Sequence, residues 1–124
     1  MLKRGYHRDK KLRALARGAP CLAWFPWCNG NAETVVWCHS NQSRHGKGGM
    51  LKSHDAYGFF GCSACNGPDP RPRSSREAAE DAAMMRTRSY LVTGRFVAGA
   101  LPADVADEDQ WLEGWRSGRI KVAR

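Results

Sequence analysis

Two pairs of cysteines frame the part of this sequence that has metal-binding chemistry. Cys21 and Cys28 are separated by six residues, and Cys62 and Cys65 by two. Four thiolates brought together by a returning chain supply the tetrahedral set of soft ligands that Zn²⁺ prefers in closed structural sites. The sequence therefore predicts one structural zinc ion. The alternative is two disulfide bonds or buried free thiols, but nothing else marks the chain as secreted.

Basic side chains gather in two stretches. The chain has 20 Lys and Arg against 12 Asp and Glu, a net charge of +8, and residues 1–20 form a basic arm. Such an excess on one side favours binding of a polyanion, although a solvated terminus is the alternative. The glycine-rich stretch over residues 44–52 lets a backbone approach phosphates closely, or is an ordinary solvated loop. The residues expected to contact DNA phosphates are Arg13, Arg17, Arg44, Lys47 and Lys52.

The length and composition are those of one compact domain. With 124 residues, 42% of them hydrophobic, the chain can bury a core. We expect a basic arm over residues 1–20, a zinc-binding domain over 21–96 and a helical extension over 97–124. No apolar run is long enough for a transmembrane helix, so no membrane partner is expected. No apolar segment precedes Cys21, so a reducing cytoplasm is expected rather than secretion.

Two short strands and a helix would position the polar residues between the cysteine pairs. Residues 7–17 have the spacing of a short basic helix. Residues 34–38 are rich in β-branched and aromatic side chains, which predicts a strand that ends at His39. Residues 40–54 predict a long loop, and residues 57–61 a returning strand.

Two further helices are predicted towards the C-terminus. Three prolines between residues 68 and 72 exclude a regular helix there. Ser74 and Glu77 form a capping box, which predicts a helix over residues 75–92. Acidic residues at its start and a glycine after its end predict another helix over residues 107–117. Its apolar face either docks on the body of the domain or contacts a partner, and comprises Trp111, Leu112 and Trp115.

Several short motifs follow one another in order over residues 10–96. They are Leu12-Arg13-x-x-Ala16-Arg17-Gly18-x-x-Cys21, Cys28-Asn29-Gly30-Asn31-x-Glu33-Thr34, His39, Lys52-x-x-Asp55, Cys62-Ser63-Ala64-Cys65 and Met85-Arg86-Thr87-x-x-x-x-Leu91-x-x-Gly94. In this order they resemble the small phage and prophage HNH-like nucleases of the YbcO type. Residues 97–124 look like an addition to that pattern.

The resemblance implies a zinc-stapled α+β fold with a ββα-metal, HNH-like core and flanking helices. In such nucleases a histidine at a strand end is the general base, which corresponds to His39. The position after the second cysteine pair is usually a histidine metal ligand, but here it is Asn66, which can still offer one oxygen. Cys38 stands where many HNH proteins have a His or Asp ligand, although a thiolate is a poor ligand for Mg²⁺.

Phosphodiester hydrolysis requires an activated water, a metal ion and cations that hold the backbone. Histidine suits the base role near neutral pH. The alternative is that His39 is a zinc ligand or only hydrogen-bonded at the strand end. Asp55 would bind the metal or orient His39, or is a turn residue before a strand. Asn66 would bind the metal or cap the next turn.

The sequence and the resemblance together predict a metal-dependent DNA endonuclease of phage or prophage origin, acting in the cytoplasm of a bacterial host. Its cofactors would be a structural Zn²⁺ and a catalytic Mg²⁺ or Mn²⁺. The alternative is a non-catalytic, zinc-stabilised nucleic-acid-binding or adaptor protein on a degenerate HNH fold. Asn66 and the proline run favour the alternative, whereas His39 and Asp55 favour the enzyme.

Overall fold

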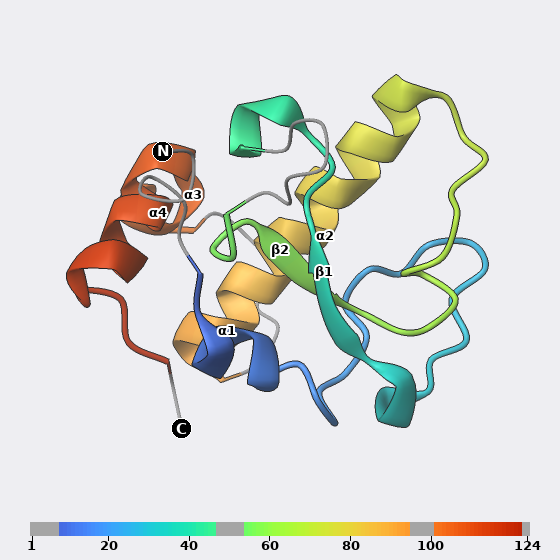
Figure 1. Ribbon diagram of the computed structural model, residues 1–124, viewed down its shortest axis with the longest axis horizontal. Helices are drawn as coiled ribbons and strands as arrows, with labels where there is room; N and C mark the ends of the chain where they lie inside the picture. The colour runs from blue at the N-terminus through green and yellow to red at the C-terminus, as the bar shows by residue number, and fades with distance from the viewer. Residues whose placement is uncertain (1–7, 47–53, 95–100, 123–124) are drawn as a thin grey trace.

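The structure, a computed structural model, describes residues 8–46, 54–94 and 101–122 (Figure 1). It is a mixed α+β fold, as predicted. No helix within these ranges is both long and apolar enough to cross a membrane. The elements in chain order are α1 (Lys10–Ala14), the 3₁₀ turn η2 (Ala32–Thr34), β1 (Val36–His39), the 3₁₀ turn η3 (Ser43–His45), β2 (Gly58–Gly61), α2 (Arg73–Thr93), α3 (Ala103–Ala106) and α4 (Glu108–Ser117).

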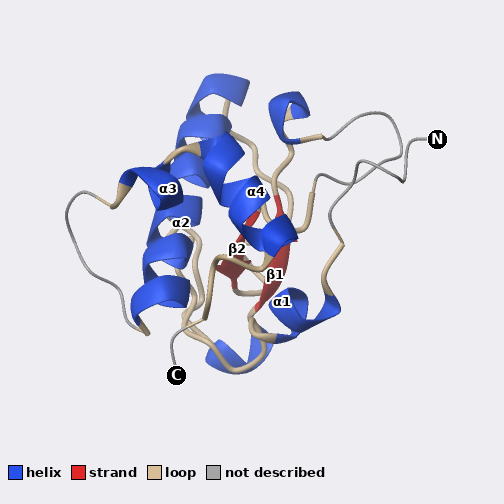
Figure 2. Cartoon of the chain, turned by 90° about the vertical axis from the view of Figure 1, so that its left-hand side faces the viewer, coloured by secondary structure: helices blue, strands red, loops and turns tan. Residues whose placement is uncertain are grey.

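The two strands form an antiparallel hairpin at the centre of the molecule, with helices around it (Figure 2). The predicted strands are confirmed, although β1 begins two residues later than expected because residues 32–34 form a 3₁₀ turn. His39 is the last residue of β1 and pairs with Gly58 of β2. All four residues of β2 are buried, so the hairpin is part of the core and not a surface ribbon.

The long helix α2 packs against β2 and crosses behind the hairpin in Figure 1. Thr87 links the two elements: its hydroxyl accepts a hydrogen bond from the Phe60 N–H (3.1 Å) and donates one to Ala83 (2.9 Å). The predicted capping role of Ser74 is wrong. The helix begins at Arg73 with Pro72 as N-cap, because a helix can start directly after a proline and no side-chain cap is formed.

The first helix is shorter than the sequence pattern suggests. It covers Lys10–Ala14, and the chain then leaves the helical path in a turn that ends at Gly18, whose φ is +75°. Asp9 caps the helix by accepting a hydrogen bond from the Leu12 N–H at 3.1 Å. Leu12 and Ala16 face the core.

The C-terminal helices dock on the body of the domain. Trp111 is 1% exposed, and its indole N–H donates to the backbone carbonyl of Ala56 at 2.7 Å. The four-residue helix α3, which the sequence pattern does not reveal, ends where Arg88 of α2 donates to the carbonyls of Val105 and Ala106. Of the two predicted roles for the apolar face of α4, the structure shows docking, and Trp111 has almost no surface left for a partner.

Candidate metal centre and catalytic site

The four predicted cysteines come together at one end of the hairpin. Their Sγ atoms all lie within 4.8 Å of one another. Cys28 is 3.5 Å from Cys21 and 3.8 Å from Cys62, and Cys21 is 3.9 Å from Cys65. A tetrahedral Zn²⁺ with bonds of about 2.3 Å to sulfur separates its ligands by about 3.8 Å, so the cluster is compatible with structural zinc. In the part of the chain that the structure describes, no other three or more His, Cys, Asp or Glu side chains bring their ligand atoms close enough together to hold a metal ion.

Backbone N–H groups support the sulfur atoms. Asn29 N–H donates to Cys62 Sγ (3.4 Å), and Cys62 N–H donates to Cys21 Sγ (3.2 Å). Burial by itself raises the pKa of Cys62, but N–H groups of Cys65 and Asn29 lower it to about 6. Burial raises the pKa of Cys28 and of Cys65. A bound cation would stabilise all four thiolates together.

Trp24 shapes the loop between the first two cysteines. Its backbone has φ of +56°, the only positive φ of a non-glycine residue in the described ranges. Its indole N–H donates to the carbonyl of Cys21 (3.1 Å), and the Arg86 guanidinium lies 4.2 Å from the ring centroid. Arg86 also donates to the carbonyls of Leu22 and Ala23, both at 2.7 Å. These contacts from α2 hold the loop in a backbone conformation that L-residues rarely adopt.

Cys38 is separate from this cluster. Its side chain is buried, and its thiol lies 3.7 Å from the carbonyl of Val36 and 3.9 Å from that of Gly61. Burial, with the nearby charges of Cys21 and Cys62, raises its pKa to about 12. Cys38 is therefore not one of the four thiols whose Sγ atoms come together.

His39 and Asp55 form a hydrogen-bonded pair at the end of β1. His39 Nε2 lies 2.7 Å from Asp55 Oδ1, and the His39 side chain is 18% exposed whereas that of Asp55 is 1% exposed. Burial by itself raises the pKa of Asp55, but hydrogen bonds from His39 and the Asp9 N–H, with the charge of Arg13, outweigh it and lower that pKa. An ionised carboxylate only accepts hydrogen bonds, so Nε2 carries the imidazole proton and Nδ1 is the acceptor nitrogen.

Two arginines lie beside this pair. Arg13 Nε is 3.2 Å from Asp55 Oδ2, and an Arg8 guanidinium nitrogen is 3.8 Å from Asp55 Oδ1. Their side chains are 43% and 42% exposed, so each guanidinium still faces solvent. The buried carboxylate thus holds two half-exposed cations next to His39. Sequence reasoning named Arg13 and missed Arg8, which only its place in the basic arm could have indicated.

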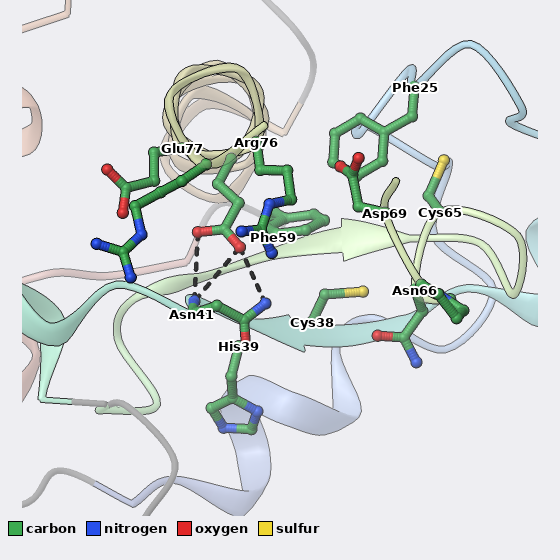
Figure 3. Close-up of a pocket in the computed structure, with 14 residues that line it drawn as sticks. Phe25, Cys38, His39, Asn41, Phe59, Cys65, Asn66, Asp69, Arg76 and Glu77 are labelled. Atoms are coloured by element: carbon green, nitrogen blue, oxygen red, sulfur yellow. Dashed lines mark hydrogen bonds between the residues drawn. The ribbon is translucent and has the colours of Figure 1, made fainter. Parts of the chain in front are cut away.

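Asn66 lines a cleft of about 410 Å³ between β1, the start of α2 and the loop after Cys65. His39 contributes to the same cleft, but Figure 3 shows its ring pointing away from α2 towards α1, with Cys38 between it and Asn66. The structure therefore brings His39 and Asp55 together. No hydrogen bond among the described residues joins the side chain of Asn66 to either of them.

One face of α2 supplies charged residues to this cleft that the sequence did not indicate as site residues. They are Arg73, Arg76, Glu77 and Glu80. Glu80 accepts hydrogen bonds from Asn41 and Gln42 at 3.0–3.3 Å, which ties α2 to the segment after β1. The bonds from Asn41 are the dashed lines in Figure 3. These side chains are three or four residues apart in the sequence, and this spacing could have indicated that they share one face of the helix.

The other residues predicted to contact DNA lie in different surroundings. Arg17 is exposed beyond the end of α1. Arg44 pairs with Asp81 at 2.9 Å and with Glu108 at 3.0 Å. Lys47 and Lys52 lie outside the described residues.

The hairpin, the helices and the cysteine cluster define a small α+β domain whose four thiols can hold a metal ion. Residues 10–97 match the family described as "Putative nuclease YbcO", and the chain belongs to this family. The resemblance stated from the motifs is thereby confirmed. No curated protein and no solved structure matches the chain.

Proposed function

We propose that this protein is a metal-dependent DNA endonuclease with His39 as general base and a structural Zn²⁺ on the four cysteines. The observation that carries the proposal is the 2.7 Å hydrogen bond between His39 Nε2 and buried Asp55, in a member of a nuclease family. The order of hairpin and then α2 supports an HNH-like ββα-metal core. Its proposed origin is a phage or prophage, and its proposed place of action is the cytoplasm of a bacterial host.

His39 and Asp55 have different roles in activating the water molecule. Asp55 holds the imidazole with its proton on Nε2, so Nδ1 accepts a proton from a water molecule. The water oxygen then bonds to phosphorus, the bond to the leaving oxygen breaks, and that oxygen takes a proton from solvent. Arg13 and Arg8 place positive charge beside the reacting phosphate and stabilise the charge that develops on its oxygens.

The proposed divalent ion, Mg²⁺ or Mn²⁺, would stabilise negative charge on the phosphate oxygens. Asn66 and Glu77 offer hard oxygen atoms, but Figure 3 shows them at opposite ends of the cleft, and the ring of His39 points away from α2. These two residues therefore do not form one site with His39. Mg²⁺ is usually bound by one or two protein oxygens together with water and substrate phosphates, so the proposed ion would be held largely by the substrate phosphate and water.

The test is a plasmid-nicking series with Mg²⁺, Mn²⁺ or EDTA. His39→Ala should lower the cleavage rate by about 10²–10⁴ while zinc content, folding and DNA affinity stay close to wild type, because a general base acts in the transition state. Asn66→His should keep or raise activity, since it restores the usual ligand of the family. EDTA should stop cleavage.

Two outcomes would overturn parts of the proposal. If wild type and Asn66→His both bind but never cleave single-stranded, duplex and branched DNA, the protein is a nucleic-acid-binding adaptor. If His39→Ala loses zinc and fold together, His39 is a structural residue and not the base.

A further inference from the structure

Two tryptophan side chains hold consecutive carbonyl groups of the segment that carries Asp55. The Trp37 indole N–H donates to the carbonyl of Asp55 at 2.9 Å. The Trp111 indole N–H donates to the carbonyl of Ala56 at 2.7 Å. Both hydrogen bonds are buried, and a buried carbonyl that loses its donor is costly, so the two indoles restrict where this backbone can lie.

Trp111 lies in α4, and this helix is bonded to residues that precede Asp55 in the chain and to one that follows it. The carboxylate of Glu108, at the start of α4, pairs with Arg44 and with the buried ring of His45. The backbone carbonyl of Glu108 accepts a hydrogen bond from the Tyr57 hydroxyl at 2.6 Å. The helix α4 is thus tied to the chain before and after Asp55, although it lies outside residues 10–97 that match the family.

We propose that Trp111 is a positioning residue for the Asp55–His39 pair, and that α4 acts on the catalytic site through this residue. For its effect on cleavage this inference rests on the proposed function. A shift of the Ala56 carbonyl would move the backbone of Asp55 and lengthen the hydrogen bond to His39 Nε2. Misplacement of a catalytic group by about 1 Å costs on the order of 10²-fold in rate.

The experiment compares two conservative changes in the zinc-loaded full chain. Trp111→Phe keeps an aromatic ring in the core but removes the N–H donor together with the rest of the pyrrole ring. Trp115→Phe is the control for the lost ring volume, because Trp115 Nε1 is buried and has no hydrogen-bond partner among the described residues. The two rings are neighbours, 5.6 Å apart at 86°, and both variants lose the same ring atoms, but only Trp111→Phe loses a hydrogen bond. Trp115 is the less buried of the two.

We expect Trp111→Phe to lower kcat for plasmid nicking by about 10-fold to 10²-fold with KM nearly unchanged, and Trp115→Phe to stay close to wild type. A role in stability alone would lower the fraction of folded enzyme without changing the properties of the folded molecules. Rates are therefore normalised to folded protein, measured by near-ultraviolet circular dichroism.

A second readout needs no cleavage. NMR of ¹⁵N-labelled protein detects the imidazole N–H proton of His39, because its hydrogen bond to Asp55 slows its exchange with water. This signal should persist in Trp115→Phe and shift or broaden in Trp111→Phe. If wild type cuts no DNA, the proposed function fails, and this signal alone decides the positioning role.

The inference is overturned if Trp111→Phe keeps both the wild-type kcat and the wild-type imidazole signal. If Trp111→Phe does not fold, Tyr57→Phe decides, because it removes the 2.6 Å hydrogen bond to α4 and keeps the aromatic ring. A smaller change of the same kind in Tyr57→Phe supports the inference, and an unchanged signal and kcat in that variant overturn it.

Discussion

At the scale of single residues, Asp55 is the most constrained polar group near the proposed site. Its side chain is 1% exposed, yet its oxygens meet the ring of His39, the N–H of Asp9 and the guanidiniums of Arg13 and Arg8. A buried charge is tolerated only when it is paired and hydrogen-bonded. With these donors around it, the carboxylate is suited to orient His39 and poorly suited to bind a divalent cation.

Substitutions can distinguish Cys38 from the four cysteines that are expected to bind zinc. Cys38→Ala should keep about one zinc per chain, because the Cys38 thiol is not among the four whose Sγ atoms come together. Cys62→Ser should lose the metal and unfold the central segment, because one ligand of four is removed. Metal analysis of the purified variants, with circular dichroism, measures both effects. Zinc loss in Cys38→Ala with an intact fold would show that Cys38 belongs to the centre.

At the scale of elements, the Trp37 ring can pack against the hairpin only because Gly58 has no side chain. A Cβ atom at Gly58 would lie 2.5 Å from the indole of Trp37 and 2.7 Å from the carbonyl of Cys38. The Trp37 ring therefore crosses β2 at this position, which lets its N–H reach the carbonyl of Asp55. The glycine that pairs with His39 in the sheet thus also permits one of the hydrogen bonds that hold Asp55.

Gly58→Ala should lower the free energy of unfolding by about 1–3 kcal/mol, because the added methyl group forces the Trp37 ring or the strand to move. Gly67→Ala is the matched control, since its nearest contact would be 3.4 Å. We expect that control to change stability by less than about 0.5 kcal/mol. Urea denaturation of the zinc-loaded proteins measures the free energies of unfolding. Equal values for Gly58→Ala and Gly67→Ala would contradict the steric argument.

At the scale of the whole molecule, the net charge of +8 favours association with DNA. The described basic residues are not equivalent, however. Arg17 is exposed, whereas Arg44 is already paired with Asp81 and Glu108. Contacts to phosphates position a nucleic acid without reading its sequence, so binding should depend on salt more than on sequence.

DNA affinity should fall steeply as salt rises, with a similar slope for unrelated sequences. Arg17→Ala should reduce the salt slope by about one unit, because one phosphate contact is lost. Arg44→Ala, our comparison variant, should change the slope less, because its guanidinium is held by two carboxylates. Fluorescence anisotropy between low and physiological salt measures these slopes, and binding that does not respond to salt would contradict the electrostatic argument.

The sequence by itself determined the features that depend on local pattern. The cysteine spacing predicted which four thiols come together, and the β-branched and aromatic residues predicted the strand that ends at His39. Acidic residues placed the start of α4 within a residue, whereas the capping box failed at α2, where Pro72 precedes the first turn. These successes arise because turns, strands and helix ends are encoded by neighbouring residues.

Only the tertiary structure decided which distant groups meet. Asp55 lies 16 residues from His39 and 46 from Asp9, and Trp111 lies 55 residues from Ala56. No local pattern specifies such pairs, because they depend on how α1, β2 and α4 pack around the hairpin. The sequence therefore named His39, Asp55 and Arg13 separately as candidates, while the folded chain shows that Arg8 and Arg13 contact Asp55 and that Trp111 holds the next carbonyl.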